Sequence, residues 1–124
     1  ISYYDDTNNR LRHAWKTIGG SSWITETAAT NSATGEFVGK FTSVATGSDG
    51  TVYISYYASS TFRLEYATGA WNSAASVYDW TSATLDDSAI VGSYTDLVIA
   101  SDGTLHISYY DGENTALKYT TVAP

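Results

Sequence analysis

The residues with the clearest chemical potential in this chain are tyrosines that recur near charged side chains. Tyr4, Tyr57 and Tyr110 each end a copy of the tetrapeptide Ile-Ser-Tyr-Tyr. An aromatic ring stacks on the apolar face of a sugar, and nearby carboxylate or guanidinium groups bond the sugar hydroxyls. The same tyrosines are equally suited to packing in a core. The predicted carbohydrate-binding set is completed by Asp5, Asp111, Arg10, Arg63, Trp23 and Trp71.

Other site chemistries have less support. The chain has no Cys, so it has no disulfide, thiolate zinc site or Cys nucleophile. His13 and His106 have no second His or Cys at a metal-ligand spacing, and both fall where the other repeats place a tyrosine. The acidic pairs at residues 5–6 and 86–87 are adjacent, whereas glycosidase chemistry needs two acids held apart across a sugar. We therefore predict no metal, no cofactor and no catalytic residues; calcium binding by residues 5–9 stays open.

The amino-acid composition limits the classes of molecule that this chain is expected to bind. Lys and Arg number 6 and Asp and Glu 13, which gives a net charge of −7 and argues against nucleic acid. No apolar run approaches the ~18 residues of a membrane helix, so we expect no membrane insertion. Few lysines, many Thr, Ser, Gly and Tyr residues and no sulfur favour a secreted or cell-surface protein. Because the chain begins at Ile1, we expect either a removed leader or a piece of a longer protein.

An internal repeat organises the 124 residues. Shifting the chain by 53 residues superimposes the three tetrapeptides without a gap and aligns Ser48–Thr51 with Ser101–Thr104. Val38-Gly39 falls on Val91-Gly92. Leu11, Leu64 and Leu117 share one column, in which Leu64 is predicted to be buried between repeats. The repeats are residues 1–53, residues 54–106 and a partial copy over residues 107–124.

Each repeat carries four short segments rich in β-branched and aromatic residues, which predict strands. Between the first two strands, Gly50 and Gly103 follow an Asp and are expected to have positive φ in a tight turn. In sheet order, the first strand is expected at 41–46 and 94–100, the second at 1–4, 51–57 and 104–110, the third at 10–15, 62–68 and 116–121, and the fourth at 23–28 and 76–81.

Four short antiparallel strands in a period of roughly 40–50 residues are typical of a β-propeller blade, so we predict an all-β chain of about two and a half four-stranded blades. The run Val-Gly-x-(Tyr/Phe)-Thr, Ser-Asp-Gly-Thr, Ile-Ser-Tyr-Tyr resembles the blade repeats of bacterial sialidase-like (BNR-type) propellers. The sialidase Asp-box is longer and lies between the third and fourth strands, so the resemblance implies the fold and no sialidase activity. In size and repeat number the chain is also similar to small two-repeat lectins that assemble into one propeller.

The repeats also predict where binding and assembly occur. The loops near residues 29–36 and 82–88, with those after each Ile-Ser-Tyr-Tyr, emerge on one face, which we expect either to bind or to form a solvated acidic rim. The first blade lacks its first strand and the last lacks its fourth, so the expected partners are other copies or flanking blades, joined by strand exchange. The acidic residues of that face are Asp5, Asp6, Glu36, Asp86, Asp87, Asp111 and Glu113.

The sequence thus favours a non-catalytic extracellular binding or adhesion module, with carbohydrate as ligand. Two alternatives stay open. One is a structural scaffold or self-assembling segment of a larger secreted protein, and the other is a fragment of a glycosidase-type propeller whose catalytic blade lies elsewhere.

Overall fold

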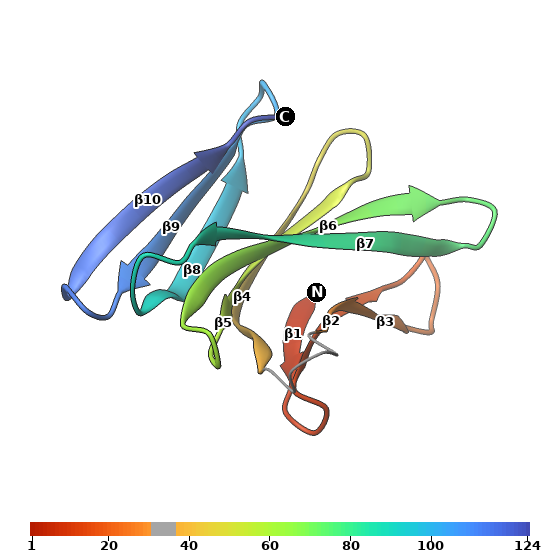
Figure 1. Cartoon of the computed structure of the whole chain (residues 1–124). Helices are drawn as coiled ribbons and strands as arrows, with labels where there is room; N and C mark the ends of the chain where they lie inside the picture. The colour runs from red at the N-terminus through yellow and green to blue at the C-terminus, as the bar shows by residue number, and fades with distance from the viewer. Residues whose placement is uncertain (31–36) are drawn as a thin grey trace.

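The chain is built from β-strands throughout the part described by the computed structural model, residues 1–30 and 37–124 (Figure 1). No described segment is a helix long and apolar enough to cross a membrane. The strands are β1 Ser2–Asp5, β2 Arg10–Trp15, β3 Ile24–Ala29, β4 Val38–Thr46, β5 Val52–Ala58, β6 Arg63–Asn72, β7 Val77–Asp86, β8 Val91–Ile99, β9 Leu105–Asp111 and β10 Ala116–Val122.

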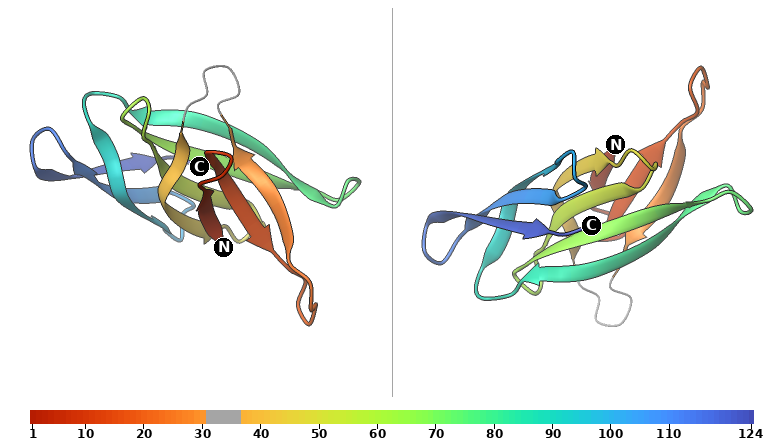
Figure 2. Two further views of the ribbon diagram at one scale, coloured as in Figure 1. Left: turned by 90° about the horizontal axis from the view of Figure 1, so that it is seen from below. Right: turned by 90° about the horizontal axis from the view of Figure 1, so that it is seen from above.

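The strands form three antiparallel sheets in chain order. The first sheet is β1-β2-β3, the second is β4-β5-β6-β7 and the third is β8-β9-β10. The second sheet lies between the other two, because β4 packs against β1 and β2 on one side and against β8 on the other (Figure 2). The turns that follow β1, β5 and β9 lie at one end of the sheets, the lower side in Figure 1, and the turns that follow β4 and β8 lie at the opposite end.

Burial along the strands follows from this layered arrangement. In β9, Leu105, Ile107 and Tyr109 are buried and the residues between them are partly exposed, the alternation expected of a strand covered on one face. In β5, the five residues Ile54–Ala58 are all buried. A strand in the middle of the central sheet is covered on both faces, so consecutive residues are buried, including the polar Ser55.

Apolar side chains between adjacent sheets form two core clusters. Leu11 of the first sheet packs with Ile54 and Tyr56 of the second. Leu64 of the second sheet packs with Ile107 and Tyr109 of the third. Each cluster joins residues from consecutive repeats, so no repeat buries its own apolar face alone.

The structure confirms much of the strand prediction. All ten predicted strands are present, and the second sheet has the predicted order of four antiparallel strands. Gly50 and Gly103 both have a φ of 87°, as expected for the turns between β4 and β5 and between β8 and β9. Leu64 is completely buried, as predicted. Leu117, in the same column, is 81% exposed because no fourth sheet lies against it in the described structure.

Several predicted strand boundaries were wrong, and the strand expected over residues 62–68 continues to Asn72. The expected loop at residues 82–88 is mostly strand, because β7 continues to Asp86 and stays paired with β6 as far as Leu64. The polar run that suggested a loop lies on an exposed outer strand, where polar side chains are tolerated. The strands expected to begin at Phe41 and Tyr94 begin three residues earlier, since the chain passes through a bulge and stays paired. Glu36, predicted for the acidic face, lies outside the described residues.

Candidate functional site

A β-bulge near the start of β4 and of β8 presents an aromatic residue in an unusual backbone conformation. The register of β4 against β5 shifts between Val38 and Ser43, and β8 shifts against β9 in the same way. Phe41 and Tyr94 occupy these bulges, each with a φ of 53°. The left-handed region is rarely adopted by bulky side chains and costs on the order of 1–2 kcal/mol. The chain adopts this conformation at the same position of both repeats.

The two bulge residues and two tyrosines form a continuous row of rings, here called the aromatic row. Its members are Tyr57, Phe41, Tyr94 and Tyr110. Successive ring centroids are 6.1, 4.4 and 6.3 Å apart. Phe41 is 42% exposed and Tyr94 is 69% exposed, whereas Tyr57 is buried beneath Phe41. The row therefore runs across the second and third sheets at the end where the turns after β5 and β9 lie.

Tyr4, the third predicted stacking tyrosine, lies in the first sheet. Its ring contacts Lys40, the residue that precedes Phe41 of the aromatic row. Its hydroxyl donates to Asn9 Oδ1 at 2.7 Å, and Lys40 Nζ lies 5.3 Å from its ring centroid. Burial and the nearby charges of Asp6 and Asp5 raise the pKa of Tyr4, so the phenol remains a neutral donor. The ring is therefore held in place by a hydrogen bond and a cation–π contact.

The two predicted aspartates have their carboxylates occupied by local turns. Asp111 accepts hydrogen bonds from Asn114 Nδ2 at 2.9 Å and from the Asn114 backbone N–H at 3.0 Å. Asp5 makes the same pair of bonds with Asn8. These hydrogen bonds lower the pKa of both carboxyl groups. Asp5 and Asp111 thus shape the turns that follow β1 and β9.

The remaining predicted residues are not members of the aromatic row. Arg10 and Arg63 begin β2 and β6 and are half-buried, and Arg10 Nε is buried without a partner among the described atoms. Trp23 is exposed with Lys16 Nζ 5.3 Å from its ring centroid, in the connection between β2 and β3. Trp71, near the end of β6, packs edge-on against Trp15 with centroids 5.1 Å apart. The structure therefore joins Tyr57 and Tyr110 with two rings that were not predicted.

A partly buried carboxylate joins the first and second sheets. Glu26 of β3 accepts hydrogen bonds from the indole N–H groups of Trp15 and Trp80, at 2.5 and 3.1 Å, and from the Tyr78 backbone N–H at 3.1 Å. His13 is buried beside it, with its ring 5.2 Å from Trp80. Burial lowers the pKa of His13, with a smaller contribution from the N-terminal charge, while Glu26 opposes the shift. His13 thus packs among aromatic rings, as the repeat predicted.

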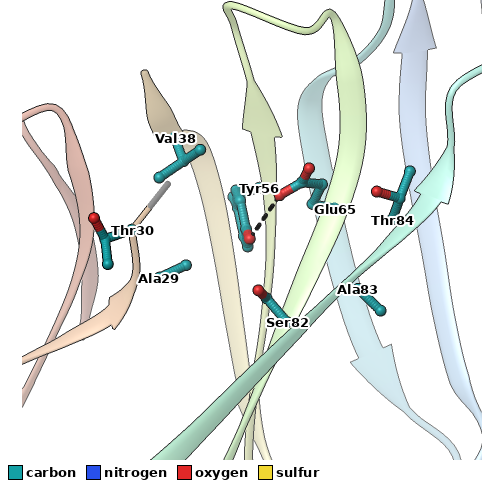
Figure 3. A pocket seen from close by; sticks show the side chains of 8 residues that line it. All are labelled: Ala29, Thr30, Val38, Tyr56, Glu65, Ser82, Ala83 and Thr84. Carbon is teal, nitrogen blue, oxygen red and sulfur yellow. Dashed lines mark hydrogen bonds between the residues drawn. The ribbon is translucent and has the colours of Figure 1, made fainter. Parts of the chain in front are cut away.

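A polar cavity of about 310 Å³ lies between the first and second sheets (Figure 3). The Tyr56 hydroxyl donates to Glu65 Oε2 at 2.8 Å, and the Ser82 and Thr84 side chains line the side formed by β7. Burial, followed by the charge and hydrogen bond of Glu65, raises the pKa of Tyr56, so this phenol stays protonated. The cavity offers hydrogen-bonding groups, but its aromatic ring is fully buried and presents no face for stacking. No group of three or more potential metal ligands occurs among the described residues.

The sequence contained a partial signal for the aromatic row. The pattern Val-Gly-x-(Phe/Tyr)-Thr is repeated 53 residues apart and includes both bulge aromatics. A period of two residues, however, assigns Phe41 and Tyr94 to a regular strand and gives no indication that the backbone is left-handed there. Comparison with known proteins adds no relative: no protein-family model matches the chain, and no curated protein matches it.

Proposed function

We propose that this chain is a non-catalytic binding module that holds carbohydrate on the aromatic row. The observation that carries the proposal is the pair of exposed bulge aromatics, Phe41 and Tyr94, in a costly backbone conformation. Exposed aromatic rings beside hydrogen-bonding side chains suit the alternating apolar faces and hydroxyl edges of a sugar. Residues held in a strained backbone conformation are often found at binding sites. The strain at Phe41 and Tyr94 therefore supports a binding role for these residues.

The spacing of the rings in the aromatic row favours an oligosaccharide as the ligand rather than a single small molecule. The centroids of Phe41 and Tyr94 are 4.4 Å apart, and Tyr110 extends the row on the third sheet. Lys40 and Ser93 directly precede Phe41 and Tyr94 in the sequence, and the Lys40 ammonium lies 5.3 Å from the centroid of the Tyr4 ring. Several weak contacts along one ligand give useful affinity through avidity.

The wider setting that we propose is a secreted or cell-surface β-propeller. Its support is the repeated stacking of sheets in chain order and the four-stranded antiparallel second sheet. In a ring of typically 4–8 such blades, β4 and β8 would be inner strands, and the aromatic row would border the central opening. Negative-stain electron microscopy of the assembled particle tests this: ring-shaped averages support the propeller, and an elongated particle overturns it.

Carbohydrate binding is tested by a glycan array followed by titration of the best glycan with purified variants. We expect Tyr94→Ala and Phe41→Ala each to weaken binding at least about tenfold, because each removes a stacking ring. Phe62→Ala is the matched control: Phe62 is also an exposed aromatic with positive φ, but it lies in the turn after β5 outside the aromatic row. The affinity of this variant is expected to stay within about twofold of that of the parent chain.

Circular dichroism of each variant separates loss of binding from loss of fold. Equal weakening by Phe62→Ala and Tyr94→Ala would show that the row is not the site. A folded chain that binds no glycan would overturn the carbohydrate proposal and favour the scaffold alternative.

A further inference from the structure

The two interfaces between sheets use the same residues at the same positions. A Cβ on Gly39 would lie 2.7 Å from the Cα of Leu11, and a Cβ on Gly92 would lie 2.7 Å from the Cα of Leu64. Both glycines have a φ above 100°. In each interface, therefore, only a glycine lets the strand approach the leucine of the preceding sheet.

A pair of hydroxyl groups accompanies each Gly–Leu contact. Ser2 Oγ lies 2.7 Å from Thr42 Oγ1 between the first and second sheets. Ser55 Oγ lies 2.9 Å from Thr95 Oγ1 between the second and third sheets. A docking strand for this surface must therefore carry Gly and, three residues later, Thr.

A backbone hydrogen bond completes each interface. The Val38 N–H donates to the Asn9 carbonyl at 3.4 Å, and the Val91 N–H donates to the Phe62 carbonyl at 3.0 Å. Asn9 and Phe62 have φ values of 54° and 60°, and Thr115 holds the equivalent place in the third sheet with a φ of 52°. The third sheet thus has the backbone conformation that presents this acceptor.

The outer face of the third sheet, here called the third-sheet face, displays the same contact residues without a neighbouring sheet. It includes Leu117, Tyr119 and Val98, which are 81%, 60% and 57% exposed. Ser108 stands in the column of Ser2 and Ser55, and its hydroxyl makes no hydrogen bond to the described residues. Exposed apolar side chains gathered on one face indicate an interaction surface.

The edge of the third sheet is also unpaired. Strand β10 pairs with β9 on one side, and no described strand lies on the other. In the second sheet the corresponding strand, β6, is paired with β7 on that side, and in the first sheet β2 is paired with β3. An open edge beside an apolar face recruits a further strand.

We propose that β9–β10 of one copy replaces β1–β2 of a second copy. Leu117 then seats against the partner copy's Gly39, and the free edge of β10 pairs with the partner copy's β3. Strands β9 and β10 can take the place of β1 and β2 because Ile107–Asp111 has the same sequence as Ile1–Asp5, and Leu117 corresponds to Leu11. This proposal rests on the repeated contacts and is independent of the ligand.

The exchange produces a more complete sheet than the one it replaces. The first sheet has three strands, whereas the hybrid of β8-β9-β10 with the partner's β3 has four, as the second sheet does. Strand β8 becomes the inner strand that the first sheet lacks, and it lies next to the partner's β4. The partner's β3 keeps Glu26, so the hydrogen bonds of that carboxylate to Trp80 and Tyr78 of its own second sheet are retained. The aromatic row also continues from Tyr94 to the partner's Phe41.

Engineered cysteines test the exchange in the full chain, which has none of its own. Ser108→Cys and Thr42→Cys chains are mixed, unfolded and refolded together, and oxidised. Because Ser108 would replace Ser2 opposite Thr42, the sulfurs would come within bonding distance. We expect about tenfold more mixed disulfide dimer than with Ser101→Cys, an exposed position in the turn after β8, because docking raises the effective concentration.

Two further variants make the result decisive. The double variant Ser2→Cys/Thr42→Cys establishes that oxidation closes this pair within one chain. Leu117→Asp, added to Ser108→Cys, is expected to reduce the mixed dimer to the Ser101→Cys level, whereas Ile18→Asp, at a fully exposed residue of the turn after β2, leaves it unchanged. If the Ser2/Thr42 pair closes and Ser108→Cys yields no more mixed dimer than Ser101→Cys, the exchange is refuted. A glycan that still binds in that case leaves the carbohydrate proposal intact.

Discussion

The second and third sheets carry nearly the same sequence at their contact positions but bury it very differently. Leu64 is completely buried and Leu117 is 81% exposed, although they occupy the same column of the repeat. Ser55 likewise bonds Thr95, while Ser108 has no partner among the described residues. The difference shows that burial in a repeat protein belongs to the interface between neighbours and is not a property of the residue type.

The largest effect that tests this comparison comes from shortening the two leucines. We expect Leu64→Ala to lower the free energy of unfolding by about 2–5 kcal/mol, because it removes buried apolar surface and leaves a cavity. Leu117→Ala is expected to change it by less than about 0.5 kcal/mol in dilute solution, where the third-sheet face is exposed. Urea denaturation followed by tryptophan fluorescence measures both. Equal losses for the two variants would contradict the difference in burial.

A smaller effect is expected at the glycine that faces Leu64. Gly92→Ala places a Cβ 2.7 Å from the Leu64 Cα on a backbone with a φ of 103°, so we expect a loss of about 2–4 kcal/mol. Gly50→Ala is the matched control, since Gly50 has a φ of 87° but a Cβ added there would meet no atom within 4 Å. The loss for this control is expected to be about 1 kcal/mol, the conformational cost alone. Thermal unfolding gives the comparison, and similar losses would show that crowding at the interface is unimportant.

The smallest effect concerns an ion pair that ties the second sheet to the third. Asp86 of β7 lies 2.6 Å from Lys118 Nζ of β10 and accepts a hydrogen bond from the Tyr109 hydroxyl at 2.7 Å. Burial opposes ionisation of Asp86, but hydrogen bonds from Lys118, Ser88 and Tyr109 outweigh it and hold its pKa well below the ordinary range. Asp86→Asn is expected to cost about 1–2 kcal/mol at pH 7.

The sign of the pH dependence follows from that lowered pKa. The folded state binds the proton of Asp86 less readily than the unfolded chain, so this stabilisation is complete above about pH 5 and is lost as the pH falls below about 4. Asp86→Asn is expected to flatten the decline in this interval, as measured by urea denaturation from pH 7 to pH 3. Asp79→Asn serves as the control, because Asp79 accepts its hydrogen bond from Asn72 within the second sheet. A parent-like acid profile for Asp86→Asn would argue against the role of this ion pair.

The repeat made the strands and their contacts predictable, because each column of the alignment repeats one environment. The buried Leu64, the turn glycines Gly50 and Gly103 and the packing role of His13 all follow from it. What sequence could not provide was the local departure from regular pairing. Nothing in residue type shows that Phe41 and Tyr94 lie at left-handed positions, or that β7 remains paired through a polar run to Asp86. These features depend on backbone register, which is set by the neighbouring strand.

The gapless repeat also determines how the molecule loses its structure. Since β4 packs on the first sheet and β8 packs on the second, the total free energy is close to a sum of terms for each sheet and each interface. The third sheet packs against the second sheet on one face, and no described sheet covers its other face. We therefore expect its amide protons to exchange by opening of that sheet alone, before the amide protons of β5 and β6. We therefore expect the outer sheets to open before the central sheet, so that an unfolding midpoint reports mainly on the central sheet.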